Sequence, residues 1–227
     1  MTAFVLFFLP ITLSLGWWQL NRAEEKKQVL AVLESRTNEA VEWISGVAPE
    51  AGFQIEACID WSGELWYLDN RTWQGRVGYE VYLPATLCDT DEPLLLGLGW
   101  IEGLASRREL PAVSGLDSLA EPVAMQGEVR PRSAAPWLTA EAEAVAPRQW
   151  RLQSLADVPD ERWGDGTPLI QLRTPDDAVL RDIWNPVNMP PERHIGYAVQ
   201  WFGLASVLVL GFLAWGIKRG RTNTMRS

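Results

Sequence analysis

Two long segments without a charged residue lie at the two ends of this 227-residue chain, and they constrain its fold more than any other feature. They are residues 2–20, "TAFVLFFLPITLSLGWWQL", and residues 195–217, "IGYAVQWFGLASVLVLGFLAWGI". A helix of about 20 apolar residues is long enough to cross a hydrocarbon core of roughly 30 Å. The sequence therefore predicts two transmembrane helices, one over 1–20 and one over 190–217.

The distribution of charge predicts how these helices are oriented. The tail over 218–227 carries four basic and no acidic residues, whereas region 21–193 carries 16 basic and 29 acidic residues, a net charge of −13. Because Lys and Arg next to a span stay on the cytoplasmic side, the basic tail is expected to be cytoplasmic. Two spans then leave both termini in the cytoplasm and the main domain in the periplasm. The absence of a presequence rich in Arg and Ser favours a bacterial inner membrane over a mitochondrial one.

A cleaved signal peptide is the alternative interpretation of the first apolar segment. Residues Ser14, Leu15 and Gly16 form the small-x-small pattern that precedes many cleavage sites. However, the segment has no basic region before it, and the bulky Trp17 and Trp18 follow directly. We therefore expect an uncleaved span.

The middle of the chain is long enough to bury a core, and its pattern is mainly that of strands. A helical connector is expected over 21–50, with an amphipathic helix over 21–43, followed by a β-rich periplasmic domain over 51–189. The fold class predicted is a membrane protein with two transmembrane α-helices flanking an α+β outer domain, mainly antiparallel β, as a small barrel or sandwich. Alternating apolar positions and turn residues predict the strands, over 53–61, 64–73, 75–87, 92–103, 121–133, 148–154 and 168–174.

Three connections in this domain have weaker patterns. Short helical pieces are expected over 105–110 and 154–164, and segment 133–147 is expected to be a loop. Cys58 and Cys88 are the only cysteines. An oxidising compartment would permit a disulfide between them, but their spacing alone does not show that they meet, and we expect two small buried residues instead.

Catalytic and metal-binding motifs are absent from the sequence. The chain has one histidine, His194. A Ser-His-Asp triad needs an imidazole close to several partners, and a multi-histidine zinc site needs several imidazoles, so the sequence indicates neither. The stretch "GLGWIEG" over 97–103 lacks the third glycine of a dinucleotide loop, because Glu102 stands there. The net charge of −9 argues against nucleic acid as a partner.

The start of the second apolar segment, "PPERHIGYAVQWFGLA" over 190–205, is the strongest candidate site. Pro190 and Pro191 are typical of a helix start. Along that helix one face carries an imidazole, a phenol and an indole, with small residues further down; these are His194, Tyr197, Ala198, Trp201 and Ala205.

The end of the first apolar segment offers Gln19 and Arg22 at the same depth, and the guanidinium could pair with the propionates of a haem. The alternative is purely interfacial: Arg22 extends toward the headgroups, the aromatic residues anchor the helix, and His194 makes a hydrogen bond in the headgroup zone.

Four blocks of this sequence resemble the Surfeit locus protein 1 family of cytochrome c oxidase assembly factors, in the family's order. They are "LGWWQLNRAEEK" (15–26), "LDNRTWQGRVGYEVYLP" (68–84), "LLLGLGW" (94–100) and "HIGYAVQWFGLA" (194–205). The third block departs from the family, which usually has an Asn-Arg pair where this chain has Gly97 and Leu98. That departure puts in doubt any role that depends on the basic side chain.

The resemblance implies a two-span membrane protein that acts in the biogenesis of oxidase subunit I. Bacterial members are associated with binding haem a and helping its insertion, and the histidine in the last block, here His194, is the usual candidate axial ligand. Our hypothesis is that His194 ligates haem iron, that Tyr197 and Trp201 flank the macrocycle, and that Arg22 meets a propionate. The partners implied are subunit I, haem a synthesis or other assembly factors, and membrane lipid.

A competing hypothesis keeps the resemblance but removes the cofactor. In it the chain is a membrane scaffold that stabilises the nascent oxidase subunit through its outer domain and helix faces. An anchored enzyme on the outer side is a third class, and the lack of a catalytic constellation argues against it.

Overall fold

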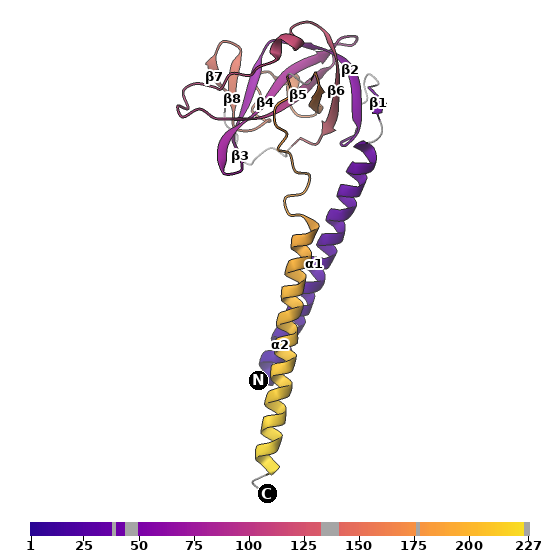
Figure 1. Cartoon of the computed structure of the whole chain (residues 1–227), viewed down its shortest axis with the longest axis vertical. Coiled ribbons are helices and arrows are strands. Elements are labelled where there is room, and N and C mark those ends of the chain that lie inside the picture. The colour runs from indigo at the N-terminus through magenta and orange to yellow at the C-terminus, as the bar shows by residue number, and fades with distance from the viewer. Residues whose placement is uncertain (38–39, 44–49, 133–140, 176–177, 225–227) are drawn as a thin grey trace. The chain divides into compact units, whose positions relative to one another are not determined.

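The computed structural model describes residues 1–37, 40–43, 50–132, 141–175 and 178–224. The chain divides into two compact units. One unit combines residues 1–31 with 185–227, and the other comprises residues 32–184. Figure 1 shows two long helices in the first unit and a sheet of strands in the second.

The first unit is a pair of helices, α1 (Thr2–Thr37) and α2 (Pro191–Thr224). Both are long and apolar enough to cross a membrane. Only 17% of the most apolar window of α1 and 11% of that of α2 is buried, unlike the core helix of a soluble protein. The helix start predicted at the Pro-Pro pair is confirmed, because α2 begins at Pro191, whose missing N–H costs nothing at that position.

The helical connector is shorter than expected. Helix α1 runs without a break past the first predicted span and ends at Thr37, and strand β1 (Ala40–Glu42) follows. The prediction of a helix up to residue 43 is therefore wrong at its end. Strand β1 pairs in parallel with β2, so a contact distant in sequence overrides the local helical pattern there.

The second unit is built around a mostly antiparallel sheet with nine strands among the described residues. Its order is β1-β2-β6-β9-β5-β4-β3-β8-β7, with a further pairing between β2 and β4. The pairings β2–β6, β6–β9, β9–β5, β5–β4 and β4–β2 thus close a circuit of five strands. The strands after β1 are β2 (Gln54–Trp61), β3 (Leu65–Trp73), β4 (Arg76–Leu87), β5 (Pro93–Glu102), β6 (Val123–Arg130), β7 (Glu143–Ala146), β8 (Gln149–Leu152) and β9 (Leu169–Thr174).

Apolar side chains inside this circuit form the main core. Its fully buried members come from all five strands of the circuit, and they include Ile55, Ile59, Leu83, Leu96, Leu98, Met125 and Ile170. A second cluster packs between β3, β8 and the outer side of β4 and β5 around Trp66, Tyr82, Leu95 and Trp163. Burial on both faces explains why β5 has the continuous apolar run "LLLGLG" rather than an alternating pattern.

All seven predicted strands are confirmed, with small shifts at their ends. Strand β7 lies in the segment that was expected to be a loop, of which residues 133–140 are outside the described residues. Strand β7 exists because it pairs with β8, whereas its Ala-rich sequence alone does not indicate a strand. Segment 105–110 has no helix, and the piece expected over 154–164 is reduced to the 3₁₀ helix η2 (Glu161–Trp163); another, η1 (Leu116–Leu119), is present.

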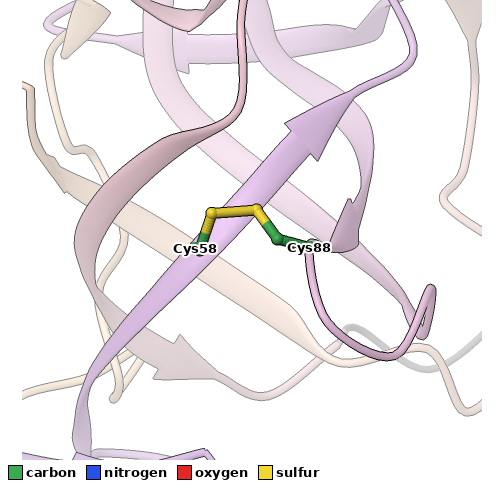
Figure 2. The surroundings of a disulfide bond; sticks show 2 residues. All are labelled: Cys58 and Cys88. Carbon is green, nitrogen blue, oxygen red and sulfur yellow. A yellow bond between two sulfur atoms is a disulfide. The ribbon is translucent and has the colours of Figure 1, made fainter.

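The two cysteines form a disulfide, contrary to the expectation that they are separate buried residues. Figure 2 shows the sulfur bridge between Cys58 and Cys88, whose Cα atoms are 5.4 Å apart. Both residues are exposed rather than buried. Spacing could not reveal this pairing because it depends on how β2 and β4 meet across the closing edge of the circuit.

Candidate functional site

His194 lies in the first turn of α2 and faces α1. Its side chain is almost buried, at 8% exposure, in the pair of helices. The ring nitrogen Nδ1 lies 2.7 Å from the side-chain oxygen Oε1 of Gln19 on α1. Gln19 was noted from the sequence only as a residue at the same depth, and the structure makes it the direct partner of the imidazole.

This hydrogen bond sets the tautomer of the imidazole. An amide oxygen can only accept, so Nδ1 must carry the hydrogen and donate it. In a neutral imidazole the other nitrogen, Nε2, then holds the free lone pair. Histidines that ligate metals commonly have this arrangement, with one ring N–H fixed by an oxygen and the other nitrogen facing the metal.

Small residues bring the two helices together below His194. On α2, Ala198 and Ala205 are buried. On α1, a Cβ added at Gly16 would come within 2.7 Å of the ring of Phe202, so the helices touch at this level. The small residues on this face could admit either a flat partner or another helix, and in the structure α1 lies against them.

The two aromatic residues of the predicted face do not share the burial of His194. Tyr197 is 44% exposed, and Trp201 is half-buried. His194, Ala198 and Ala205 are buried, whereas Tyr197 is exposed. The structure therefore does not bring the phenol and the imidazole together at the helix contact, and Tyr197 can only meet a molecule that lies beside the pair.

Arg22 already has partners on its own helix. Its guanidinium forms an ion pair of 2.6 Å with Glu25, three residues further along α1, and lies 5.7 Å from the ring of Trp18. Both charged side chains are about half exposed, so this pair is weak and can be exchanged for another anion. These contacts of Arg22 are with Glu25 and Trp18, and they do not involve His194.

An apolar cavity of about 510 Å³ lies further along the helix pair. Leu9 and Leu13 line it on α1, and Phe202, Ala205, Ser206, Val209 and Leu210 line it on α2. It begins about two turns from His194 along α2. The lining holds no charged side chain, so the cavity suits an acyl or isoprenoid chain but offers no chemistry of its own.

The second unit contains a buried ionic cluster that the sequence did not reveal. Arg130 lies 2.9 Å from both Glu128 and Asp182, and Arg173 lies 2.8 Å from Glu128. The Arg130 guanidinium also stacks on Trp184, 3.8 Å from the ring centroid. The cluster joins β6, β9 and the segment after β9, and the sequence showed Glu128, Arg130 and Arg173 only as charges inside two predicted strands.

Burial shifts the pKa of several groups around this face of the sheet. It lowers the pKa of Arg130, although Asp182 and Glu128 counteract the shift. It raises the pKa of Glu80, with Asp182 adding to the shift and Arg71 opposing it. It also raises the pKa of Tyr82 strongly. These shifts arise from desolvation of a charge-balanced cluster, which is an ordinary structural arrangement.

The departure from the family pattern can be located in the structure. Leu98 is fully buried in the main core, so no charged side chain would fit there without rearrangement. A Cβ added at Gly97 would come within 3.0 Å of Gln171 and 3.4 Å of Tyr82. Both residues therefore serve the packing of β5 in this chain.

A protein-bound metal ion and a haem iron need different numbers of ligating side chains. Among the described residues, no group of three or more His, Cys, Asp or Glu side chains could hold a metal ion. A protein-only metal site therefore does not fit the described residues. One imidazole with a fixed tautomer does fit a single axial ligand of haem iron, for which the porphyrin supplies the remaining in-plane nitrogens.

Comparison with known proteins identifies the family. The search of curated proteins finds no match. The model of the SURF1 family matches residues 6–206, from the first helix through the sheet and into the second helix. The match covers far more than half of the chain and includes His194, Gln19 and the whole strand circuit. The chain therefore belongs to the SURF1 family, which is known as a family of cytochrome c oxidase assembly factors.

Proposed function

We propose that this chain assists the delivery of haem a to subunit I of cytochrome c oxidase, or its insertion there. The observation that carries the proposal is the 2.7 Å hydrogen bond between His194 Nδ1 and Gln19 Oε1. It fixes the imidazole and leaves Nε2 with its lone pair. A bound haem would supply an iron centre, and His194 would hold it through Nε2.

The residues of the helix pair divide the work of holding the cofactor. His194 provides the ligand atom, and Gln19 orients the ring as a positioning residue. The contact between Gly16 and Phe202 closes the space between the helices, so the macrocycle has to lie beside the pair. Tyr197 and Trp201 are accessible there and would flank it, and Arg22 would exchange Glu25 for a propionate.

A single protein ligand suits a carrier that must release its cargo. With His194 as the one protein ligand, release of the haem would require only one bond from this chain to the iron to break. The weak pair of Arg22 with Glu25 allows the propionate contact to form and break without a large change in stability. The partners proposed are therefore subunit I and haem a synthesis or other assembly factors.

We also propose that the chain is a multi-pass protein of the bacterial inner membrane with both termini cytoplasmic. The segments proposed are 1–20 and 190–217 as spans, 21–50 as a connector, 51–189 as the periplasmic domain and 218–227 as the cytoplasmic tail. The basic residues of the tail and the low burial of both apolar helices support this topology. Protease added to intact spheroplasts should degrade the outer domain, and protection of that domain would contradict the orientation.

A cofactor-free scaffold is the second candidate function, and the structure offers observations in its favour. His194 is almost buried, the helices touch at Gly16, and Arg22 is already paired. All three are expected of a helix pair whose faces bind the nascent oxidase subunit directly. In that case the hydrogen bond between His194 and Gln19 serves only to hold the helices together.

One experiment separates the two functions. The full chain is produced together with a haem a supply, purified in detergent and compared by visible spectroscopy with His194→Ala and with the matched control Tyr197→Phe. The haem-delivery function predicts bound haem a in the wild type, its loss in His194→Ala and its retention in Tyr197→Phe. Unchanged haem binding in His194→Ala contradicts the ligand assignment.

Oxidase assembly in cells gives the second half of the test. A scaffold predicts that the wild type purifies without haem and that His194→Ala still supports assembly. Haem delivery through His194 predicts that assembly fails in this variant although the chain accumulates normally in the membrane. Immunoblotting of the membrane fraction distinguishes that failure from loss of the protein.

A further inference from the structure

The disulfide sits at the closing edge of the strand circuit. Strands β2 and β4 pair at only three positions, Ile59 with Leu87, Asp60 with Thr86 and Trp61 with Ala85. Cys58 and Cys88 continue this register by one position, and the N–H of Cys88 donates a 3.0 Å hydrogen bond to the carbonyl oxygen of Cys58. The disulfide therefore fastens the end of this three-position pairing, which is one of the two shortest in the circuit and is here called the β2–β4 seam.

Both strands of the seam have longer pairings elsewhere. Strand β2 pairs with β6 over six positions, and β4 pairs with β5 over nine. Loss of the seam would leave β2 and β4 in their places in the remaining sheet. The circuit can therefore open at the seam without the unit unfolding, whereas opening at any of those longer edges would disrupt much more hydrogen bonding.

The two bonded cysteine residues lie at the surface of the unit. Cys58 and Cys88 are both exposed, and they line a cavity of about 270 Å³ together with Trp43, Glu56, Ala57, Leu87, Asp89 and Thr90. Thiol–disulfide exchange requires a thiolate to approach along the sulfur–sulfur bond, so burial normally protects structural disulfides. This disulfide lacks that protection, and the cavity provides room for an incoming sulfur.

The charge around the cavity selects among thiols. Two acidic side chains, Glu56 and Asp89, are part of the lining, and the described lining residues include no basic one. A thiolate that carries further negative charge is repelled there, whereas one with a neighbouring cation is attracted.

We propose that Cys58–Cys88 is a thiol–disulfide exchange site for a dithiol with neutral or basic surroundings, and that its reduction opens the β2–β4 seam. The thiolate of the dithiol attacks one sulfur, forms a mixed disulfide and displaces the other cysteine as a thiolate. The second thiol of the dithiol, after losing its proton, then attacks the mixed disulfide. This releases the first cysteine and the oxidised dithiol, so two electrons pass to the chain and two protons end on its thiols.

Small thiols of opposite charge test access and selectivity. The full chain in detergent, without denaturant, is treated with cysteamine or with 2-mercaptoethanesulfonate at equal thiolate concentration. Free cysteines are counted by the gel shift of a polyethylene glycol maleimide. We expect cysteamine to reduce the bond about three- to tenfold faster at low ionic strength, with the difference shrinking at high salt.

Charge variants give the matched controls for that comparison. In Glu56→Gln/Asp89→Asn the two reagents should act at nearly equal rates, whereas Glu121→Gln, an exposed acid outside the cavity, should keep the wild-type ratio. Reduction that occurs only in denaturant would overturn the exchange site. An unchanged ratio in the double variant would overturn the selectivity.

Hydrogen exchange tests the opening of the seam. After reduction, backbone amides at Asp60 and Thr86 should exchange at least tenfold faster, while amides that join β4 to β5 keep their protection. The Cys58→Ser/Cys88→Ser chain should reproduce this pattern without any reductant. Unchanged protection at the seam in both samples would show that the disulfide does not control the circuit.

Discussion

At the scale of single residues, Arg130 lies at the centre of the buried ionic cluster in the second unit. Its side chain is 6% exposed, and it neutralises Glu128 and Asp182 while stacking on Trp184. A buried cluster of this kind adds little stability over an apolar equivalent, but removal of one partner leaves uncompensated charge in a poorly solvated place. The arrangement is therefore sensitive to any change at Arg130.

The substitution Arg130→Met should reduce the free energy of unfolding by about 3 kcal/mol, because Glu128 and Asp182 lose the buried one of the two cations that they share; the other, Arg173, is 38% exposed. Urea unfolding of the full chain in detergent, followed by far-UV circular dichroism, measures the change. The control is Arg76→Met, since Arg76 forms only an exposed ion pair with Glu102 and should cost about 1 kcal/mol or less. Equal effects of the two substitutions would contradict the importance assigned to burial.

Glu80 should make the stability of the second unit, residues 32–184, depend on pH. Burial raises the pKa of Glu80 above its ordinary value of 4.5 in the folded chain. Between the ordinary and the raised pKa the folded state binds more protons than the unfolded state, so the free energy of unfolding falls as pH rises through this window.

In Glu80→Gln this part of the pH dependence should disappear. Unfolding of the wild type and the variant, measured from pH 4 upward, gives a difference curve that isolates Glu80. The raised pKa of Glu80 would be contradicted if the difference in unfolding free energy between wild type and variant stayed constant with pH. It would also be contradicted if that difference changed in favour of the wild type as the Glu80 carboxyl ionises.

At the scale of elements, the pairing of α1 with α2 depends on small residues. The sequence predicted both helices from their apolar runs and the start of α2 from its prolines. It also placed Ala198 and Ala205 on one face with His194, and these three residues are buried in the structure. It could not assign Gln19 to His194, because that contact depends on the rotation of two helices far apart in sequence. The same limit applies to the β2–β4 seam and its disulfide.

Substitution of Gly16 tests the helix pairing. In Gly16→Ala the new Cβ would stand 2.7 Å from Phe202, so the helices must separate or the ring must move. We expect the thermal midpoint of the detergent-solubilised chain to fall and the additional change Phe202→Ala to suppress the loss partly.

The control for this substitution is Gly203→Ala on α2, where an added Cβ meets nothing within 4 Å. It should leave the midpoint unchanged or raise it, because alanine favours a helix over glycine. If Gly16→Ala proves as harmless as Gly203→Ala, the helices do not touch as described.

At the scale of the whole molecule, local pattern predicted more of the elements than of their connections. Two apolar helices around a mostly antiparallel sheet were predictable, since hydrophobic runs and alternation are local signals. The short strands β1 and β7, the five-strand circuit and the buried charges around Arg130 were not, because each exists only through partners distant in sequence. For the proposed site, the sequence showed which residue types are present. It did not show that His194 is buried while Tyr197 is exposed.

The central claim is that His194 ligates haem iron, and the composition of the chain allows a direct measurement. His194 is the only histidine, so growth with ¹⁵N-histidine labels one imidazole in the full chain when purification uses a tag without histidine. Electron–nuclear double resonance of the ferric haem-loaded protein should then reveal a ¹⁵N coupling from an axial ligand. Bound haem without a ¹⁵N coupling, or a chain that never retains haem, would contradict the claim.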